Sequence, residues 1–320
     1  MPGRNASRGH STRGWAIAII FGTSMKLLLI YNPHAAHGNA LRNLSAVEEE
    51  FRARGLEFDL RMTLRPGHAV ELVRAADLPS YDGVVAAGGD GTLFETVTGC
   101  YQNRSLRKIP IGVLPMGTGN AFARDLGLET GRFQEAVDVI ARARPRKVDV
   151  GRISTGGKRY FFMNIVGLGF VSDVVETASR LKFIGNLSYT IGVLIRTAFL
   201  GSYGIRIEAD GRVLERENIF TEISNTRYTS NFLMAPDASI DDGLLDVTLL
   251  SRINRRRLLQ CFPLIFTGKH VSMPEVETFK ARHISIATDR PKVLTPDGEL
   301  LGSTPVEIEC LPRDVEVFWK

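Results

Sequence analysis

The stretch GVVAAGGDGTLFETV, residues 83–97, decides the fold of the first part of the chain. Its first five residues are small and apolar, as expected of a strand buried on both faces of a parallel sheet. Three glycines then surround Asp90, and a helix is predicted from about Thr92. Such a turn suits glycine alone and points N–H groups and the positive helix end outward, toward a phosphate. A plain turn needs one glycine, so three favour a phosphate loop in which Asp90 holds magnesium or orients a hydroxyl.

Strands and helices alternate on both sides of this stretch. The other predicted strands are Lys26–Tyr31, Glu57–Thr63 and Ile111–Leu114, and the other predicted helices are Leu41–Arg54, Gly67–Ala76 and one that starts at Ala121–Leu126. This alternation implies βαβ units and therefore a doubly wound parallel sheet.

The pattern changes after Lys147, where short alternating strands with hairpin turns begin. The predicted strands are Val148–Ser154, Arg159–Val166, Gly204–Ala209, Arg212–Glu215, Asn218–Asn225, Leu245–Leu250, His283–Ala287, Lys292–Thr295 and Val306–Leu311. Two helical stretches, Val171–Arg196 and Asn254–Thr267, interrupt them. Many short strands joined by turns such as Asp210-Gly211 indicate a β-sandwich or barrel.

A basic cluster around Pro145 marks the predicted junction between two domains, 25–147 and 148–320. Two domains also suit a length of 320 residues. Residues 1–24 are rich in Gly, Ser, Arg and Asn, and the first strand begins only at Lys26. We therefore expect 1–24 to be a disordered or dispensable extension.

Composition narrows the class of protein. The chain has 40 Lys+Arg against 35 Asp+Glu, but three of the arginines lie before Met25, and removing them from 40 leaves 37. The predicted folded part therefore has no electrostatic footprint for nucleic acid. No run reaches the ~18–20 apolar residues of a membrane span, so no transmembrane segment is expected. Three widely spaced cysteines indicate a reducing compartment, and we expect a cytoplasmic protein.

Two further loops follow predicted strands at the same edge of the sheet. They are Asn32–Gly38 after the first strand and Gly117-Thr118-Gly119-Asn120 after the fourth. Ligands of doubly wound sheets bind at the carboxyl ends of strands, so both glycine loops should line one crevice. Neither GxxxxGK[ST] nor GxGxxG occurs at a strand-to-helix turn, which disfavours a dinucleotide oxidoreductase.

Four motifs in order carry a resemblance to a known family. GGDGT (88–92), PMGTGNAFARDLGL (115–128), APDASIDDGLLDV (235–247) and PDGEL (296–300) resemble the diacylglycerol kinase catalytic-domain family, which includes bacterial lipid kinases and sphingosine and ceramide kinases. The resemblance covers Lys26 to Lys320. It implies a nucleotide-binding α/β domain followed by a β-sandwich, with the active site in the cleft between them. It also implies transfer of the γ-phosphoryl group of ATP, with Mg²⁺, to a lipid hydroxyl.

The resemblance assigns site residues by motif. The catalytic residues are Glu299, as the general base, and Asp90. The nucleotide-binding residues are Asn32, Pro33, His34, Ala35, Ala36, Thr63, Gly88, Gly89, Asp90, Gly91, Thr92, Leu93, Phe94 and Thr118. The ligands of a structural magnesium ion are Ser239, Asp242 and Leu244. Ala36 replaces a Gly of the family and Phe94 stands where it often has Asn, so we expect an altered first loop and a lost polar contact.

Two apolar stretches concern the lipid. The second helical stretch contains apolar residues that follow four arginines, Arg252 and 255–257. This stretch either packs on the sheet or touches an anionic membrane surface. The first helical stretch either packs as a plain helix or lines an acyl-chain groove with Phe183, Ile184, Leu187, Tyr189, Ile191 and Leu194.

The leading hypothesis is a cytoplasmic, peripherally membrane-associated lipid kinase that acts on diacylglycerol or a related lipid alcohol. A kinase of sphingoid bases or of another lipid would use the same machinery. A NAD or sugar kinase would share only GGDGT, and the GTGN loop and the late DGE argue against it. A non-catalytic nucleotide- or lipid-binding regulator follows if Ala36 and Phe94 have spoiled the phosphate site. The sequence leaves the lipid open, and also whether the chain forms a homodimer.

Overall fold

The computed structural model describes residues 24–105, 108–180 and 188–320. Of the predicted extension only Ser24 is among them, and Phe183, Ile184 and Leu187 of the predicted acyl groove lie outside them. Within the described residues, no helix is long and apolar enough to cross a membrane.

The N-terminal domain is built on four parallel strands with nearly the predicted bounds. In pairing order they are β2 (Glu57–Met62), β1 (Lys26–Tyr31), β3 (Gly83–Gly88) and β4 (Ile111–Pro115). The side chains of β1, β3 and β4 are almost all buried. Helices cover both faces of the sheet, which explains why these strands read as unbroken apolar runs.

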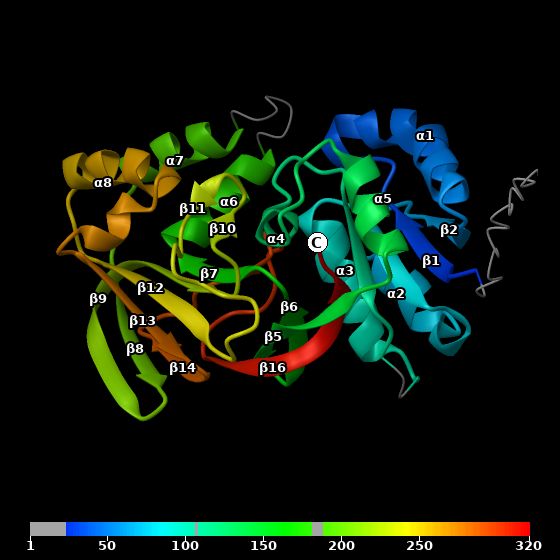
Figure 1. Cartoon of the computed structure of the whole chain (residues 1–320). Helices are drawn as coiled ribbons and strands as arrows, with labels where there is room; N and C mark the ends of the chain where they lie inside the picture. The colour runs from blue at the N-terminus through cyan, green and yellow to red at the C-terminus, as the bar shows by residue number, and fades with distance from the viewer. Residues whose placement is uncertain (1–23, 106–107, 181–187) are drawn as a thin grey trace, which may run out of the picture.

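Five helices flank this sheet, and α1 packs with α5 while α2 packs with α3 (Figure 1). Their bounds are α1 (Asn39–Ala53), α2 (His68–Ala75), α3 (Asp90–Gln102), α4 (Ala121–Asp125) and α5 (Phe133–Ala141), with short 3-10 turns η1 (Ala35–Gly38) and η2 (Leu78–Ser80). Helix α3 begins at Asp90, two residues earlier than predicted, because Gly89 is extended and the N–H groups of Thr92 and Leu93 already bond its carbonyl.

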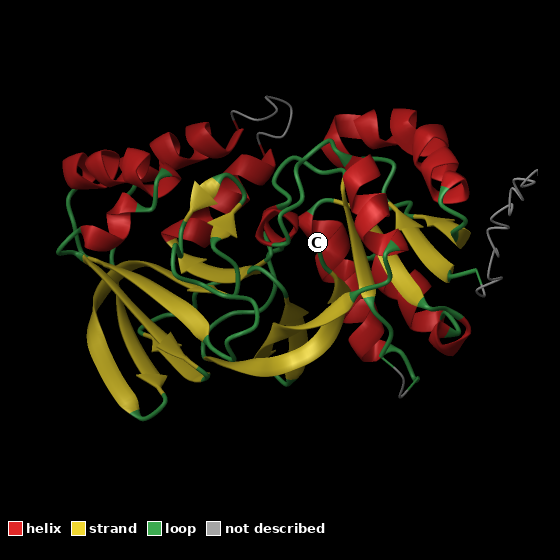
Figure 2. Ribbon diagram, in the orientation of Figure 1, coloured by secondary structure: helices red, strands yellow, loops and turns green. Residues whose placement is uncertain are grey.

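The C-terminal domain is mostly β, with helices gathered on one side (Figure 2). Its strands are β5 (Pro145–Thr155), β6 (Lys158–Phe162), β7 (Ile165–Gly169), β8 (Tyr203–Ala209), β9 (Arg212–Ser224), β10 (Tyr228–Thr229), β11 (Phe232–Leu233), β12 (Leu245–Ser251), β13 (Val276–Ala281), β14 (His283–Thr288), β15 (Leu294–Pro296) and β16 (Val306–Phe318). Its helical segments are α6 (Phe170–Arg180), α7 (Ser188–Ala198), α8 (Arg255–Cys261), η4 (Phe262–Phe266) and η5 (Lys269–Ser272).

Strand β16 joins the two domains. Its first residues pair with β14, its length pairs with β5, and Val317 pairs in parallel with Ile111 of β4. The C-terminal strand therefore extends the N-terminal sheet. Tyr101 of α3 adds a second link, because its ring stacks on Phe161 of β6 with centroids 3.7 Å apart. The predicted boundary at 147/148 stays a prediction, and the last strand crosses it in space.

Several predicted strands differ in extent. Residues 159–166 form two strands, β6 and β7, because the chain turns at Met163 and Asn164. Residues 212–215 and 218–225 join into the single strand β9, and β13 was not predicted. The predicted helix 171–196 comprises α6 and α7, with residues between them that the structure does not describe.

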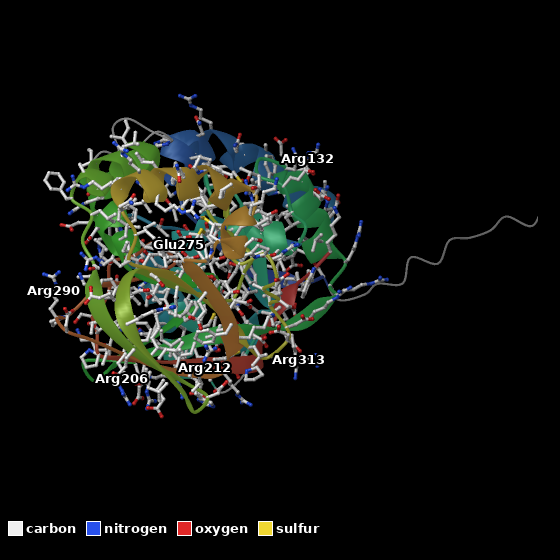
Figure 3. All side chains as sticks on the ribbon, turned by 90° about the vertical axis from the view of Figure 1, so that its left-hand side faces the viewer. Arg132, Arg206, Arg212, Glu275, Arg290 and Arg313 are labelled. Atoms are coloured by element: carbon white, nitrogen blue, oxygen red, sulfur yellow. The ribbon has the colours of Figure 1, made fainter. Side chains whose placement is uncertain are left out.

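Two hydrophobic cores meet at α3. One fills the N-terminal domain, and the other fills the C-terminal domain but includes Phe94 of α3. Seen from the C-terminal domain, Arg206 of β8 and Arg212 of β9 lie in the lower part of the view, away from α8 in its upper part (Figure 3).

Candidate active site

Two glycine loops lie against each other at the carboxyl edge of the parallel sheet. The Gly88 carbonyl accepts the N–H groups of Met116 (2.9 Å) and Gly117 (3.1 Å). A Cβ atom on Gly117 would stand 2.4 Å from the Cα of Gly89, so the crossing has no room for a side chain. The N-terminus of α3 opens beside it, where free N–H groups and the helix dipole favour an anion. The two glycine loops therefore meet at one place, and their N–H groups suit the phosphates of a nucleotide; a crevice lined by both loops stays a prediction.

The first loop is tied to this crossing through Asn32. Its Nδ2 donates to Thr92 Oγ1 at 3.1 Å, and its Oδ1 accepts the His34 N–H at 3.0 Å. Ala36 has φ 48° and ψ 48°, a left-handed conformation that costs an L-residue about 1–2 kcal/mol and that glycine adopts freely. Whether this alters nucleotide binding stays a prediction.

Asp90, the first residue of α3, faces a cavity between the domains. Its Oδ1 lies 3.4 Å from Asn164 Nδ2 and 3.5 Å from the Phe122 N–H nitrogen. Burial raises the pKa of Asp90, and hydrogen bonds from the backbone of Ala121 and Phe122 and from Asn164 oppose that shift. The side chain of Asp90 is thus held by long contacts, which leaves it able to take a further partner.

Glu299 reaches the same place from the C-terminal domain. It lies in the turn after β15, where its N–H donates to the Pro296 carbonyl at 2.9 Å. Its Oε1 lies 3.3 Å from the position that a Cβ atom on Gly91 would take, so the carboxylate stands against the first turn of α3. The two acids assigned as catalytic, Asp90 and Glu299, therefore come together although 209 positions separate them in the sequence.

Asp297 holds the turn that carries Glu299. Its carboxylate accepts the N–H groups of Met163, Asn164 and Ile165 at 3.1, 3.0 and 2.9 Å. Burial raises the pKa of Asp297 to about 7, and the nearby charge of Asp90 adds to the shift. The same three hydrogen bonds explain why the chain turns between β6 and β7.

The cavity between the domains has a volume of about 480 Å³. Asp90 and Ala121 line it from the N-terminal domain, and the C-terminal domain contributes Asn164, Thr229, Ser230, Asp297 and Glu299, with Val171, Val175 and Ala178 of α6. The lining therefore combines three acids with apolar side chains of α6. This suits a substrate with a reacting polar end and an apolar body.

The remaining nucleotide-binding predictions fall into two groups. Thr63 is buried at the end of β2 and Thr118 is exposed on the second glycine loop, both at the carboxyl edge. The side chains of Leu93 and Phe94 are buried in the two hydrophobic cores instead, so only their backbone could face a ligand. Sequence analysis missed Asn164 and Ser230, which line the cavity. The φ of 54° at Ser230 is visible only in the structure.

The predicted metal ligands lie elsewhere. Ser239, Asp242 and Leu244 belong to the loop before β12, outside the lining of the cavity described above. Asp242 Oδ1 accepts the Leu244 N–H at 3.0 Å, and its Oδ2 accepts a hydrogen bond from Lys280 Nζ at 2.6 Å. The one carboxylate of the set is already paired with a cation, so the set does not fit a magnesium ion. In the part of the chain that the structure describes, no cluster of three His, Cys, Asp or Glu has metal-site geometry.

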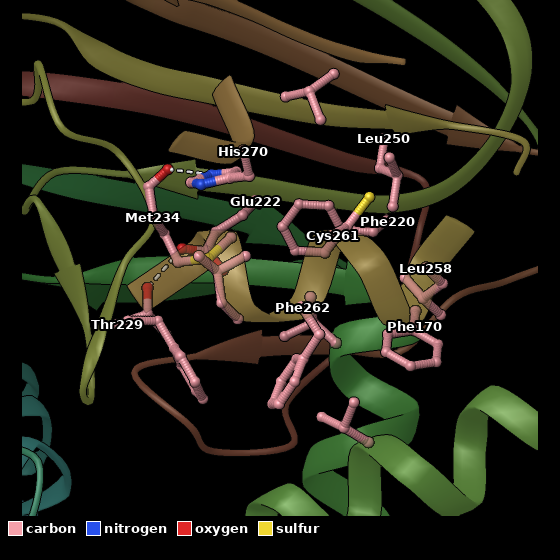
Figure 4. Close-up of a pocket in the computed structure, with 15 residues that line it drawn as sticks. Phe170, Phe220, Glu222, Thr229, Met234, Leu250, Leu258, Cys261, Phe262 and His270 are labelled. Carbon is pink, nitrogen blue, oxygen red and sulfur yellow. Dashed lines mark hydrogen bonds between the residues drawn. The ribbon is translucent and has the colours of Figure 1, made fainter. Parts of the chain in front are cut away.

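A second, narrow cavity of about 90 Å³ lies beneath α6, α7 and α8 (Figure 4). Its walls are apolar, with Phe170, Val193, Phe220, Leu258 and Phe262 among them. Val171 and Thr229 line both this cavity and the one that holds Asp90 and Glu299. The apolar cavity is therefore the inner neighbour of the candidate active site.

Glu222 is the acid in the wall of this apolar cavity. It is 1 % exposed, and its Oε1 accepts hydrogen bonds from Thr229 Oγ1 at 2.5 Å and Ser224 Oγ at 3.3 Å (Figure 4). Burial raises the pKa of Glu222 to about 7 against the weaker effect of these hydroxyls. A large part of the Glu222 population is therefore uncharged at neutral pH.

Both parts of the chain match known protein families. Residues 26–153 match the family described as diacylglycerol kinase catalytic domain, and residues 164–319 match the one described as YegS C-terminal NAD kinase beta sandwich-like domain. The predicted fold class, a doubly wound α/β domain followed by a β-sandwich, is thereby confirmed.

Relatives match over almost the whole chain. A diacylglycerol kinase of Staphylococcus carnosus is 33 % identical over 91 % of this chain and 94 % of its own. One of Mycobacterium tuberculosis is 30 % identical over 92 % and 94 %. A crystal structure of a proposed diacylglycerol kinase from Bacillus anthracis has a TM-score of 0.79 at 26 % identity, covering 92 % of this chain and 95 % of that one.

Proposed function

Because the chain belongs to the diacylglycerol kinase catalytic-domain family of ATP-dependent kinases, we propose that it phosphorylates a membrane lipid on a hydroxyl group. Diacylglycerol or a related lipid alcohol is the proposed acceptor. One observation carries the proposal: Asp90, which directly follows the crossing of the glycine loops, and Glu299 line one cavity, and that cavity borders an apolar one. A nucleotide on one side and a lipid on the other would meet at these acids.

The residues divide the chemistry between them. Bound ATP would supply the γ-phosphoryl group, and the two glycine loops, Asn32 and Thr118 would hold its phosphates. Glu299 takes the proton of the acceptor hydroxyl as that oxygen becomes a nucleophile. Asp90 either holds the divalent ion that accompanies the nucleotide or orients the hydroxyl. Asp297 positions Glu299 by fixing the turn between them.

The apolar cavity supports a lipid rather than a soluble acceptor. It offers little for a sugar or nucleoside to hydrogen-bond, whereas each buried CH₂ of an apolar chain gains about 0.8 kcal/mol. Val171 and Thr229 stand where a lipid hydroxyl at Glu299 would continue into its apolar part. The raised pKa of Glu222 lowers the average charge beside that path.

The decisive experiment measures transfer of labelled phosphate from ATP to lipids in vesicles, including diacylglycerol, sphingosine and a total lipid extract. We expect Glu299→Gln to lose about 10²–10⁴-fold in kcat and Asp90→Ala to abolish transfer, while Glu215→Gln on the exposed face of β9 stays active. Full activity of both site variants would refute their roles. Transfer only to NAD or to a sugar would refute the lipid acceptor, and ATP binding without any turnover would favour a regulator.

We further propose that the surface of α7 and α8 contacts an anionic membrane from the cytoplasm. Phe199 after α7 is 78 % exposed and Leu259 of α8 is 45 % exposed, close to the exposed Arg255 and Arg256. Shallow insertion of apolar side chains between basic ones is typical of interfacial helices. Arg257 does not belong to this surface, because both its Nε and Nη2 bond Glu275.

Vesicle sedimentation tests this contact. A double Arg255/Arg256→Ala variant should lose binding to anionic vesicles, by about 1 kcal/mol per arginine. A double Arg206/Arg212→Ala variant, altered on β8 and β9 away from α8 (Figure 3), should bind like the unaltered protein. Equal binding of both variants would exclude this surface.

A further inference from the structure

Lys280 lies among oxygen atoms beside the loop in which the family resemblance implies a structural metal, and it shares one predicted ligand, Asp242. It is on β13, opposite Asp246 of β12. Its Nζ lies 2.6 Å from Asp242 Oδ2, 2.9 Å from the carbonyl oxygen of Asp237 and 3.4 Å from Asp246 Oδ2. An ammonium group has three hydrogens to donate, and three oxygens surround it here.

The cluster around Lys280 is partly buried. The side chains of Lys280, Asp242 and Asp246 are only 31 %, 29 % and 14 % exposed. Solvent therefore screens this cluster less than an ordinary surface salt bridge.

A divalent ion would compete directly with Lys280. It would need Asp242, the only carboxylate among the predicted ligands, together with the carbonyls of Ser239 and Leu244. Both Asp242 oxygens are engaged, by Lys280 and by the Leu244 N–H. A metal that takes Asp242 Oδ2 would have to displace the ammonium group, and a metal on Oδ1 would lie beside a like charge.

We propose that Lys280 replaces the structural magnesium ion of the family in this chain, as a built-in cation that holds the loop 237–244 against β12 and β13. The C-terminal domain then needs no metal for its stability. The proposal does not depend on the proposed kinase activity, for which a nucleotide-bound divalent ion is a separate requirement.

Thermal unfolding without nucleotide tests the replacement. The unaltered protein should melt at the same temperature in EDTA and in excess MgCl₂. Lys280→Met should melt lower in EDTA by about 4 °C or more, and Mg²⁺ should restore most of the loss because the ligands are then free. Lys108→Met, which removes an ion pair between the segment before β4 and Asp314 of β16, should show a smaller loss that Mg²⁺ does not reverse.

Three results would overturn the proposal. They are loss of stability of the unaltered protein in EDTA, a loss in Lys280→Met no larger than in Lys108→Met, and a loss that Mg²⁺ leaves unchanged. If Lys280→Met does not fold, binding of Mn²⁺ to the unaltered protein decides. We expect no stoichiometric binding without nucleotide, and a bound Mn²⁺ that Asp242→Asn abolishes would show that a metal holds the site.

Discussion

Replacing Glu222 by Gln should remove a pH-dependent loss of stability. Glu222 is buried in the wall of the apolar cavity and is held by two hydroxyl groups rather than by a cation. Because burial raises its pKa, the folded chain binds this proton more tightly than the unfolded chain does. Stability from this group is therefore complete below the unfolded pKa and falls as the pH rises toward the folded pKa.

The size of the effect follows from the two pKa values, 4.5 for an ordinary Glu and about 7 for Glu222. Each pKa unit corresponds to about 1.36 kcal/mol, so the loss amounts to about 3 kcal/mol, spread between about pH 4.5 and pH 7. Gln has no proton to lose and keeps an oxygen for the hydroxyls of Thr229 and Ser224. The free energy of unfolding of Glu222→Gln should therefore lack this slope.

Urea unfolding of both proteins from about pH 4 to about pH 8 measures the slope. The difference between their free energies of unfolding should change by about 3 kcal/mol in favour of Glu222→Gln toward high pH. Glu215→Gln, on the exposed part of the same strand, should show no such change. A constant difference between Glu222→Gln and the unaltered protein would refute the reasoning, because it would mean that water or a cation stabilises the Glu222 carboxylate.

Two further changes test the site geometry. Gly117→Ala places a Cβ atom 2.4 Å from Gly89 Cα, so this variant should bind fluorescent ATP analogues at least tenfold more weakly. Gly201→Ala, with no atom within 4 Å of its Cβ, should bind them normally. Equal binding by the two variants would mean that the loops do not hold the nucleotide. Asp297→Asn removes one of the acceptor oxygens for the N–H groups of residues 163–165 and should cost about 1–3 kcal/mol of stability. It should also lower kcat, because Glu299 moves. Unchanged kcat and melting temperature would contradict the positioning role of Asp297.

The α/β domain could be predicted closely because its signals are local. A strand buried on both faces must be apolar throughout, and glycine turns mark where strands become helices, so β1 to β4 have nearly their predicted bounds. The C-terminal strands were harder to delimit. Residues 159–166 alternate like one strand, and only the carboxylate of Asp297, more than 130 positions away, shows why the chain turns at Asn164.

The residues of the candidate site likewise differ in how far the sequence could predict them. The motifs indicated Asp90, Glu299 and the glycine loops, because each needs a residue type that chemistry restricts. Asn164 and Ser230 carry no such signal, since a single Asn or Ser is common in any turn. The predicted metal site shows what a motif cannot reveal. Ser239, Asp242 and Leu244 match the motif, but only the fold places Lys280 of another strand against Asp242.

Local chemistry can be read from the order of the residues: which segments are apolar, where glycine is needed and which acids could serve phosphoryl transfer. Which of these groups meet depends on the tertiary fold. Strand β16 brings the C-terminal domain back against β4, the turn at Asp297 places Glu299 on the first turn of α3, and β13 places Lys280 on Asp242. Contacts between residues far apart in the chain depend on how sheets pair and pack, and no local pattern records that pairing.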